Sequence, residues 1–415
     1  MTDSNSHVSR RAYLKGVGVG GAAGMSSLSG CTAFGGGGSS DTITIAGTVP
    51  LTGSFSSIGQ DMERGYELGV QRMNENLDQE VELVLADDES DADRLRNQLN
   101  QAVSNNDVDM LWGSFSSLLV TAGSAFAENQ GIPFLGVAFA YMQPHLDRGY
   151  EWTFAPFPKS RDVARSTAGL LELIPEEERP STIGIWEPNS GWGQEQADYW
   201  EEELSGDYDI ALREKFSIGS QDFSTLISQS KSAGVEALLS NPTPGGGITA
   251  MKQMQSNDFA PKLLKFVRGA DPSAWWSALG QNGAFATMCP GWVPGLTGNG
   301  NSTLDESYRS EYDIGDDQLL PVQVGTSYNL TQVAEQTLAN AESTEPDAVR
   351  EVLRSREFNT VIGDFSFENN GLPREGQLTA PVGQWWEGGQ HTVYPDVDGD
   401  AAIDFKYPLT PWGER

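Results

Sequence analysis

Short β-branched runs alternate along this chain with longer stretches in which apolar residues recur every three or four positions. In the stretch 59–76, for example, Met62, Tyr66, Val70 and Met73 would share one face of a helix. The same pattern predicts strands at 42–49, 81–86, 109–113 and 132–137, and helices at 59–76, 91–104 and 117–129. Strands and helices that alternate in this way indicate an α/β protein.

A second set of alternating elements follows the proline-containing stretch 152–158. We expect helices at 160–173, 192–205, 222–233 and 247–256, and strands at 182–186, 210–216, 237–241 and 262–267. A strand near 284–288 and helices near 326–340 and 347–354 come next. The stretch 382–394, with Gly388-Gly389 between two apolar runs, predicts a β-hairpin.

The first forty residues carry two export signals in the order that export requires. Ser9-Arg10-Arg11-Ala12-Tyr13-Leu14-Lys15 matches a twin-arginine signal, and Leu28-Ser29-Gly30-Cys31 resembles a lipobox, whose cysteine receives a lipid. The run between them, 16–30, is too short and too rich in glycine for a transmembrane helix. We therefore expect a signal peptide at 1–30, and a lipidated Cys31 with a Gly/Ser tether at 31–41. The rest of the chain would then be anchored at the extracellular face of the cytoplasmic membrane.

The chain is strongly acidic, with a formal net charge of −32. Residues 1–30 carry Arg10, Arg11 and Lys15 against Asp3, so residues 31–415 carry −34. A field of this sign disfavours nucleic acid and anionic lipid surfaces as partners. The acids are spread along the whole chain and lysine is scarce, which favours adaptation to high salt, as in halophiles, over a site for a cationic ligand.

Histidine is scarce in the chain, and the common sequence motifs of hydrolases are missing. The chain has three histidines and neither a G-x-S-x-G nor an H-E-x-x-H motif, so an exported hydrolase is disfavoured and no cofactor or metal is expected. The acids between Asp396 and Asp404 depart from the spacing of a calcium loop. If Cys31 is lipidated, Cys289 has no disulfide partner, and its apolar surroundings indicate a small core residue. Asn301 and Asn329 begin glycosylation sequons.

Six segments, in the right order, resemble the branched-chain-amino-acid type of periplasmic substrate-binding protein that feeds ABC importers. They are 49–53 with Gly59, 113–117, 148–154, 222–227, 359–367 and 383–389, of which 359–367 is the most specific. The resemblance implies a type I fold of two α/β lobes, each a mostly parallel sheet flanked by helices, joined by three hinge crossings. One lobe would take 42–155 plus 288–365, and the other 156–287 plus 366–415. A small amino acid or related carboxylate or amide would be captured between them by hinge closure, for delivery to ABC permease subunits.

A ligand-binding sensor that docks on a membrane receptor uses the same fold and is the alternative function. In either case the ligand is expected beyond the carboxyl ends of the strands. Ser116 and Ser117 follow a strand there, and either bind a ligand carboxylate or only cap the next helix. By the resemblance, the segment of Phe139, Ala140 and Tyr141 lies where amino-acid binders carry an Ala and a Thr that hold the head group, and Tyr141 replaces that Thr. Phe139 and Tyr141 would instead form the floor of an aromatic or flat pocket, or pack the hinge.

The resemblance places Trp192 over the ligand from the second lobe, and we also expect contacts from Thr243 and Tyr328. The ligand class depends on Arg268 and Asp271. An Arg268 that faces the cleft would hold a carboxylate and repel an ammonium, whereas an Asp271 in that position would bind the ammonium of an amino acid. Arg268 would alternatively be a surface residue that balances local acids. The sequence leaves these alternatives open.

Overall fold

The computed structural model describes residues 42–137, 139–296, 299–315, 320–395 and 405–415. The export signals, Cys31, the tether and the acids at 396–404 therefore lie outside the described residues. In the part that is described, no helix combines the length and the apolar character needed to span a membrane.

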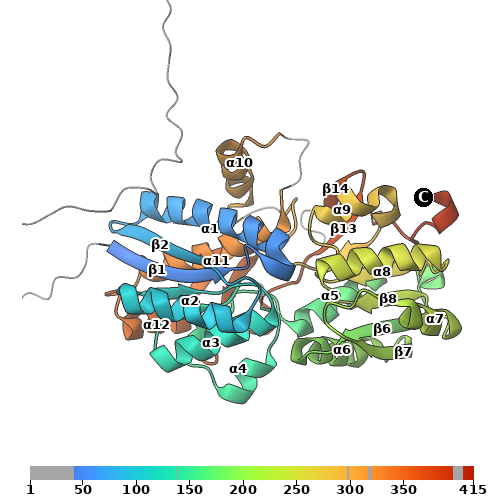
Figure 1. The fold of residues 1–415 in the computed structure, drawn as a ribbon, viewed down its shortest axis with the longest axis horizontal. Coiled ribbons are helices and arrows are strands. Elements are labelled where there is room, and N and C mark those ends of the chain that lie inside the picture. Colours follow the sequence, from blue (N-terminus) through green and yellow to red (C-terminus); the bar gives the residue numbers. More distant parts are fainter. Residues whose placement is uncertain (1–41, 138, 297–298, 316–319, 396–404) are drawn as a thin grey trace, which may run out of the picture. The chain divides into compact units, whose positions relative to one another are not determined.

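The first half of the chain builds a five-stranded parallel sheet in the order β2-β1-β3-β4-β5. The side chains of successive residues in β3 point to opposite faces of this sheet, because side chains alternate along a strand. Met110 and Trp112 pack with α1, α11 and α12, whereas Leu111 packs with α2 and α3 (Figure 1). The elements are β1 (Thr42–Val49), α1 (Ser56–Asn76), β2 (Glu80–Asp87), α2 (Ala92–Asn105), β3 (Met110–Trp112), α3 (Ser117–Gln130), β4 (Phe134–Leu135), β5 (Thr153–Phe154), α11 (Val322–Leu338) and α12 (Pro346–Ser355). This is the first lobe.

The second lobe is built on a seven-stranded sheet in the order β14-β13-β10-β9-β8-β6-β7. Strand β13 runs antiparallel to β10 and β14, and the other pairs are parallel. Helices α7, α8 and α9 cover one face and α5 and α6 the other. The elements are α5 (Ser160–Glu172), β6 (Thr182–Pro188), α6 (Gly191–Leu204), β7 (Asp209–Phe216), α7 (Ser224–Ser232), β8 (Ala237–Ser240), α8 (Pro244–Ser256), β9 (Leu263–Phe266), α9 (Ala274–Leu279), β10 (Thr287–Met288), β13 (Val382–Trp386) and β14 (Gly389–Tyr394).

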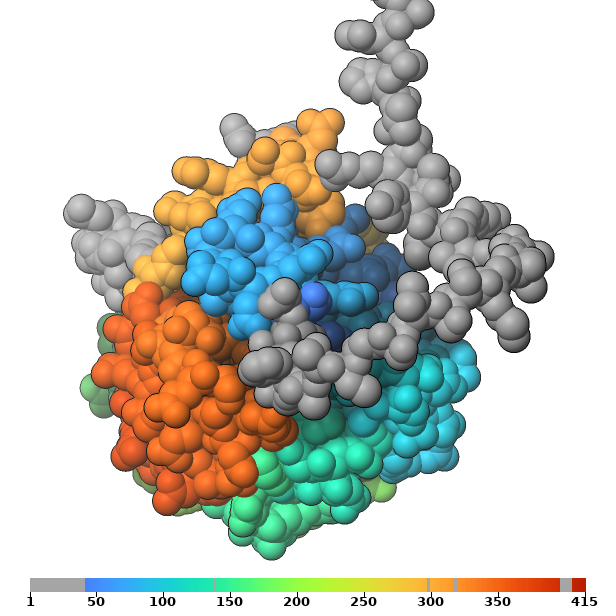
Figure 2. Space-filling model, turned by 90° about the vertical axis from the view of Figure 1, so that its left-hand side faces the viewer, coloured from blue at the N-terminus to red at the C-terminus, as the bar shows by residue number. Residues whose placement is uncertain are grey.

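The chain passes between the lobes three times. It leaves the first sheet after β5, returns from β10 to the helices of the first lobe, and leaves again before β13. Segments distant in sequence therefore become neighbours. The Arg350 guanidinium of α12 lies 4.0 Å from the ring centroid of Trp152, and Figure 2 shows the orange and teal segments that carry these residues forming one surface. The expected two-lobed α/β fold with three crossings is confirmed.

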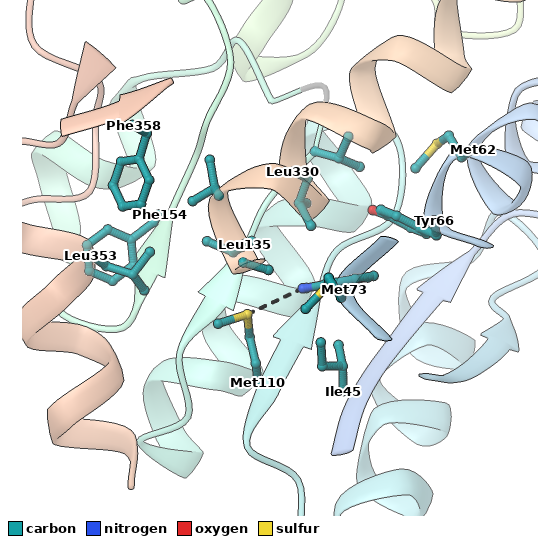
Figure 3. Close-up of a cluster of buried hydrophobic side chains, with 14 of the residues drawn as sticks. Ile45, Met62, Tyr66, Met73, Met110, Leu135, Phe154, Leu330, Leu353 and Phe358 are labelled. Carbon is teal, nitrogen blue, oxygen red and sulfur yellow. Dashed lines mark hydrogen bonds between the residues drawn. The ribbon is translucent and has the colours of Figure 1, made fainter. Parts of the chain in front are cut away.

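Helix α11 is the central helix of the first lobe. Its residues Leu330 and Val333 join a buried cluster with Ile45 of β1 and with Met62 and Tyr66 of α1 (Figure 3). The two helices approach closely because α1 has glycine at the contact. A Cβ on Gly65 would collide with Ser327.

The expected strands and helices are present with small shifts of their ends, and the 382–394 hairpin is confirmed as β13 and β14. The structure adds elements that the pattern did not predict: helices α4 (Gln143–Arg148) and α10 (Asn301–Tyr312), the hairpin of β11 (Glu357–Thr360) with β12 (Gly363–Ser366), and short 3₁₀ turns at Gly53–Phe55, Glu176–Glu178, Gly280–Gly283 and Trp412–Glu414. Helix α4 is too short for its periodicity to be recognised, as is α9.

Both sequon asparagines are structural. Asn301 accepts a hydrogen bond from the Trp292 indole at 2.7 Å and donates to the Val361 carbonyl at 2.9 Å. Asn329 donates to the Pro156 carbonyl at 2.6 Å, and both side chains are buried. A glycan on either amide would require these contacts to break, so the packing seen here disfavours glycosylation at both positions.

Candidate functional site

A cavity of about 510 Å³ is lined by residues of both lobes. The first lobe supplies loops that follow β1, β2, β3 and β4, and the second supplies the loops after β6, β7, β8 and β9. These are carboxyl ends of parallel strands, where open α/β sheets bind their ligands. The cavity therefore lies beyond the carboxyl ends of the strands, where we expected a ligand from the sequence.

Three helices begin at this cavity. The residues that cap α3, α6 and α8 are Ser116, Ser190 and Thr243, and all three line it. Each side-chain oxygen accepts a backbone N–H of its own helix, from Leu119, Gly193 and Gly246 respectively. The first N–H groups of a helix have no intrahelical acceptor, and each N-terminus carries a partial positive charge of about half an elementary charge. The cavity thus favours an anion.

Ser116 has a strained backbone. Its backbone dihedrals, a φ of 79° and a ψ of 150°, lie in a region that residues other than glycine rarely adopt. The conformation turns the chain sharply between β3 and α3, so that Ser116 and Ser117 both line the cavity. Such strain is maintained only where surrounding structure enforces it, and it is common at binding sites.

Aromatic side chains form much of the remaining wall. They are Phe55 and Phe115 of the first lobe, Phe157 of the first crossing, and Trp192 and Phe216 of the second lobe. The Trp192 indole donates to Ser160 Oγ at 3.2 Å, and Ser160 donates to Glu195 at 2.6 Å. The indole N–H is thereby used inside the protein, which leaves the ring as an apolar surface at the cavity.

Arg268 and Asp271 form an ion pair, with 2.8 Å between Nε and Oδ2. The guanidinium also donates to Gln323 Oε1 of α11 at 2.7 Å and to the Pro290 carbonyl. Arg268 lines the cavity with 7% of its surface exposed, whereas Asp271 is 1% exposed and lies behind it. Burial raises the pKa of Asp271, and the adjacent guanidinium opposes that rise.

A buried lysine lies near the lining residue Cys289. Lys265 of β9 is fully buried, and its Nζ has no hydrogen-bond partner among the described residues. It interacts electrostatically with Cys289, whose side chain lines the cavity. Burial lowers the pKa of Lys265 because the charged ammonium is desolvated there. Cys289 itself is 1% exposed and packs in the core, as its sequence context indicated.

The structure brings six of the ten expected ligand residues together at the cavity: Ser116, Ser117, Ala140, Trp192, Thr243 and Arg268. Four lie elsewhere. Phe139 is fully buried, with its ring beside those of Tyr141 and His145, and Asp271 is buried and paired with Arg268. Tyr328 faces α1, where its hydroxyl accepts from Arg72 at 2.9 Å.

Tyr141 lines a different cavity of about 410 Å³, together with Gly191, Glu195 and Tyr199 of α6. Its hydroxyl lies so close to Gly191 that a Cβ there would collide with it. Glu195 accepts the backbone N–H groups of Met142 and Gln143 at 2.9 and 2.7 Å, which ties α6 to the segment after β4. Phe139 and Tyr141 thus pack around the first crossing, which was the alternative that the sequence left open.

Several cavity residues had no sequence signal of their own. Phe55 and Phe115 precede helices as ordinary apolar residues, and Leu118 and Ile218 are rim side chains that are 65% and 55% exposed. Asn241 accepts the backbone N–H of Arg268 at 2.8 Å and so fixes the start of that loop. Their position after a strand was the only available indication. Among the described residues, no group of acidic, histidine or cysteine side chains is suited to hold a metal.

Comparisons with known proteins agree with this geometry. The family model described as periplasmic binding protein matches residues 42–387. The Leu/Ile/Val-binding protein homolog 7 of Brucella abortus is 23% identical over 379 residues, which cover 86% of this chain and 92% of that protein.

Two solved structures share the fold, both at a TM-score of 0.71 and 15% identity. One is the solute-binding protein of an ABC transporter from R. palustris in complex with benzoate, covering 85% of this chain and 95% of that one. The other is the branched-chain amino acid transporter substrate-binding protein LivJ from Streptococcus pneumoniae in complex with isoleucine, covering 85% and 100%. These similar proteins are binding proteins and not enzymes. With a family model matched over most of its length and a cavity between two α/β lobes, the chain belongs to the periplasmic binding protein family.

Proposed function

We propose that this protein is the solute receptor of an ABC importer and captures a small organic acid, an amino acid or a related carboxylate, between its lobes. The observation that carries the proposal is the cavity onto which three helix N-termini open, one from the first lobe and two from the second. A carboxylate bound there would contact both lobes and so favour their closure. The lobes would be 42–155 plus 288–365 and 156–287 plus 366–415, moving about the three crossings.

The proteins of similar fold support a carboxylate ligand. Isoleucine and benzoate, the ligands named for two of them, differ in size and in the presence of an ammonium but share a carboxylate. The cavity of this chain offers three groups of backbone N–H donors for such a group and aromatic walls for an apolar body.

A thermal-shift screen tests the binding function. The panel contains branched-chain and aromatic amino acids, their deaminated acids, and short amides, in molar KCl. A ligand at a hundred times its dissociation constant stabilises the folded state by about 2.7 kcal/mol. A rise in melting temperature with any carboxylate of the panel is expected. If every compound leaves the melting temperature unchanged, the proposed ligand class is wrong.

The proposal includes export by the twin-arginine route and a lipid anchor at Cys31, which would hold the receptor at the extracellular face of the cytoplasmic membrane, next to its permease. The net charge of −32 supports a halophilic source. Mass spectrometry of the protein extracted from membranes tests the anchor. A lipid adduct on Cys31 is expected, together with release of the Cys31→Ala variant into the medium; an unmodified Cys31 on a full-length chain would refute the anchor.

A further inference from the structure

The charges around the 510 Å³ cavity are arranged unequally. Among the described residues that line it, Arg268 is the only one with a charged side chain, and none carries a carboxylate. Asp88 and Asp271 lie on loops that line the cavity, but both are buried and do not line it, and the exposed Glu89 beside Ser90 does not line it either. An ammonium group in the cavity would therefore have no carboxylate to pair with, and desolvating an unpaired charge is costly.

Asp271 lies three residues from the lining residue Arg268, and that arginine is its counter-ion. Arg268 Nε lies 2.8 Å from Asp271 Oδ2, and Gln323 Nε2 donates to the same oxygen at 3.2 Å. The guanidinium lies 4.9 Å from the ring centroid of Phe115 and 6.0 Å from that of Phe157, and Arg268 lines the cavity whereas Asp271 does not. Asp271 is therefore already paired with Arg268, and a ligand ammonium would have to compete with that arginine for it.

The remaining charges favour an anion. The Arg268–Asp271 pair is neutral as a unit, whereas Lys265 is buried near the lining residue Cys289 with no hydrogen-bond partner among the described residues, so an anion in the cavity would favour its charged form. The N-termini of α3, α6 and α8 add partial positive charge from three directions. A bound carboxylate would offset these positive charges, and an amino-acid zwitterion would add a second, unmatched positive charge.

We propose that the cavity takes an organic carboxylate that lacks an ammonium group and has an apolar, ring-sized body, such as an aromatic acid or a deaminated branched-chain acid. The inference rests on the proposed receptor function and narrows its ligand class. Arg268 is the specificity-determining residue, because it removes Asp271 from the ligand. Lys265, buried near Cys289, stabilises the bound anion.

Isothermal titration calorimetry of the full-length protein tests the inference with matched pairs. 3-Phenylpropanoate is compared with phenylalanine, 4-methyl-2-oxopentanoate with leucine, and benzoate with benzamide. The amine-free acids are expected to bind at least tenfold more tightly than their partners. Equal or tighter binding of the amino acids would overturn this inference and leave the receptor function intact, and equal binding of benzamide would refute the anion preference. Absence of binding by the whole panel would refute the proposed carboxylate ligand class as well as this inference.

Two variants address the charges individually. Lys265→Met is expected to weaken benzoate binding at least tenfold while the melting temperature of the ligand-free protein stays equal or rises, because an unpaired buried amine is removed. A merely structural lysine would instead lower the melting temperature and leave affinity unchanged. The matched control, Lys252→Met on the exposed face of α8, should change neither.

Arg268→Gln exposes Asp271 and is expected to shift the affinity ratio of leucine to 4-methyl-2-oxopentanoate at least tenfold toward leucine. Asp271→Asn, which keeps the shape and removes the acid, should tighten benzoate binding, and it provides the test if the Arg268 variant does not fold. Unchanged ratios in a folded variant would show that the pair does not set specificity.

Discussion

Arg268 and Asp271, three residues apart on the loop after β9, bind each other at 2.8 Å rather than competing for a ligand. The pair is nearly buried, and Gln323 of α11 hydrogen-bonds to both side chains. A residue of the second lobe is thereby linked to a helix of the first, beside one of the crossings. The ion pair consequently has a structural role in addition to its proposed influence on the ligand.

Removal of one partner of this pair should destabilise the fold more than removal of both. Asp271→Leu leaves a buried guanidinium without its counter-ion, which typically costs 3–5 kcal/mol, roughly. The double variant Arg268→Met/Asp271→Leu removes both charges and should recover most of that loss. Urea denaturation of the ligand-free proteins measures the free energies of unfolding. A double variant that is as unstable as the two single changes added together would contradict a buried, coupled pair.

The close contact between α1 and α11 predicts that one methyl group added at Gly65 lowers the stability of the fold. In Gly65→Ala the new Cβ collides with Ser327 and with the Val324 carbonyl, and overpacking of this kind costs about 1–3 kcal/mol. The better helix propensity of alanine offsets only about 1 kcal/mol of it. Gly206→Ala is the control, since no atom lies within 4 Å of its Cβ position, and it should stay within about 0.5 kcal/mol of the wild type. Equal melting temperatures for the two variants would contradict the helix packing.

The buried His145 predicts acid sensitivity. Burial lowers its pKa from 6.5 to about 3, and its Nδ1 lies 2.7 Å from the Asn370 carbonyl. The ring therefore stays neutral in the folded chain, while the unfolded chain takes up a proton near pH 6.5. Unfolding binds more protons between these pH values, so stability falls as the pH drops from about 6.5 toward 3.

One proton corresponds to a slope of about 1.4 kcal/mol per pH unit within that range. His145→Gln keeps a donor for Asn370 and cannot titrate, so its stability should fall less steeply between pH 6 and pH 4 than that of the wild type. His391→Gln, at a half-buried position on β14, serves as the control. Denaturation midpoints across this pH series measure the difference, and parallel curves for wild type and His145→Gln would refute the neutral buried ring.

Trp192 should contribute binding energy through its ring. Trp192→Ala removes an apolar wall of the cavity. The lost aromatic contact should reduce the binding free energy by roughly 1.5–3 kcal/mol, which corresponds to about tenfold to a hundredfold weaker binding. Ser160→Ala frees the indole N–H from its 3.2 Å hydrogen bond and should weaken binding less. Tyr199→Ala, on the same helix but at the other cavity, should bind as the wild type does. Titration calorimetry with benzoate compares them, and full affinity in Trp192→Ala would remove this residue from the site.

The sequence predicted the fold well because alternation and helical periodicity report burial on one face. β1 and the 382–394 hairpin follow from that pattern directly. The site was harder to predict. Helix α11 is buried on nearly every side, so its periodicity could not show that Tyr328 faces Arg72 of α1. Residues 268 and 271 lie in a loop, where spacing does not define a face, and only the three-dimensional structure shows that they pair.

The most direct test of the account is a crystal structure of the protein grown with benzoate at saturating concentration. The account predicts that the ligand occupies the cavity between the lobes, with its carboxylate within hydrogen-bond distance of backbone N–H groups in the first turns of α3 or α8 and its ring against Trp192 or Phe115. Density for benzoate elsewhere, or an unoccupied cavity at saturation, would contradict the proposed site.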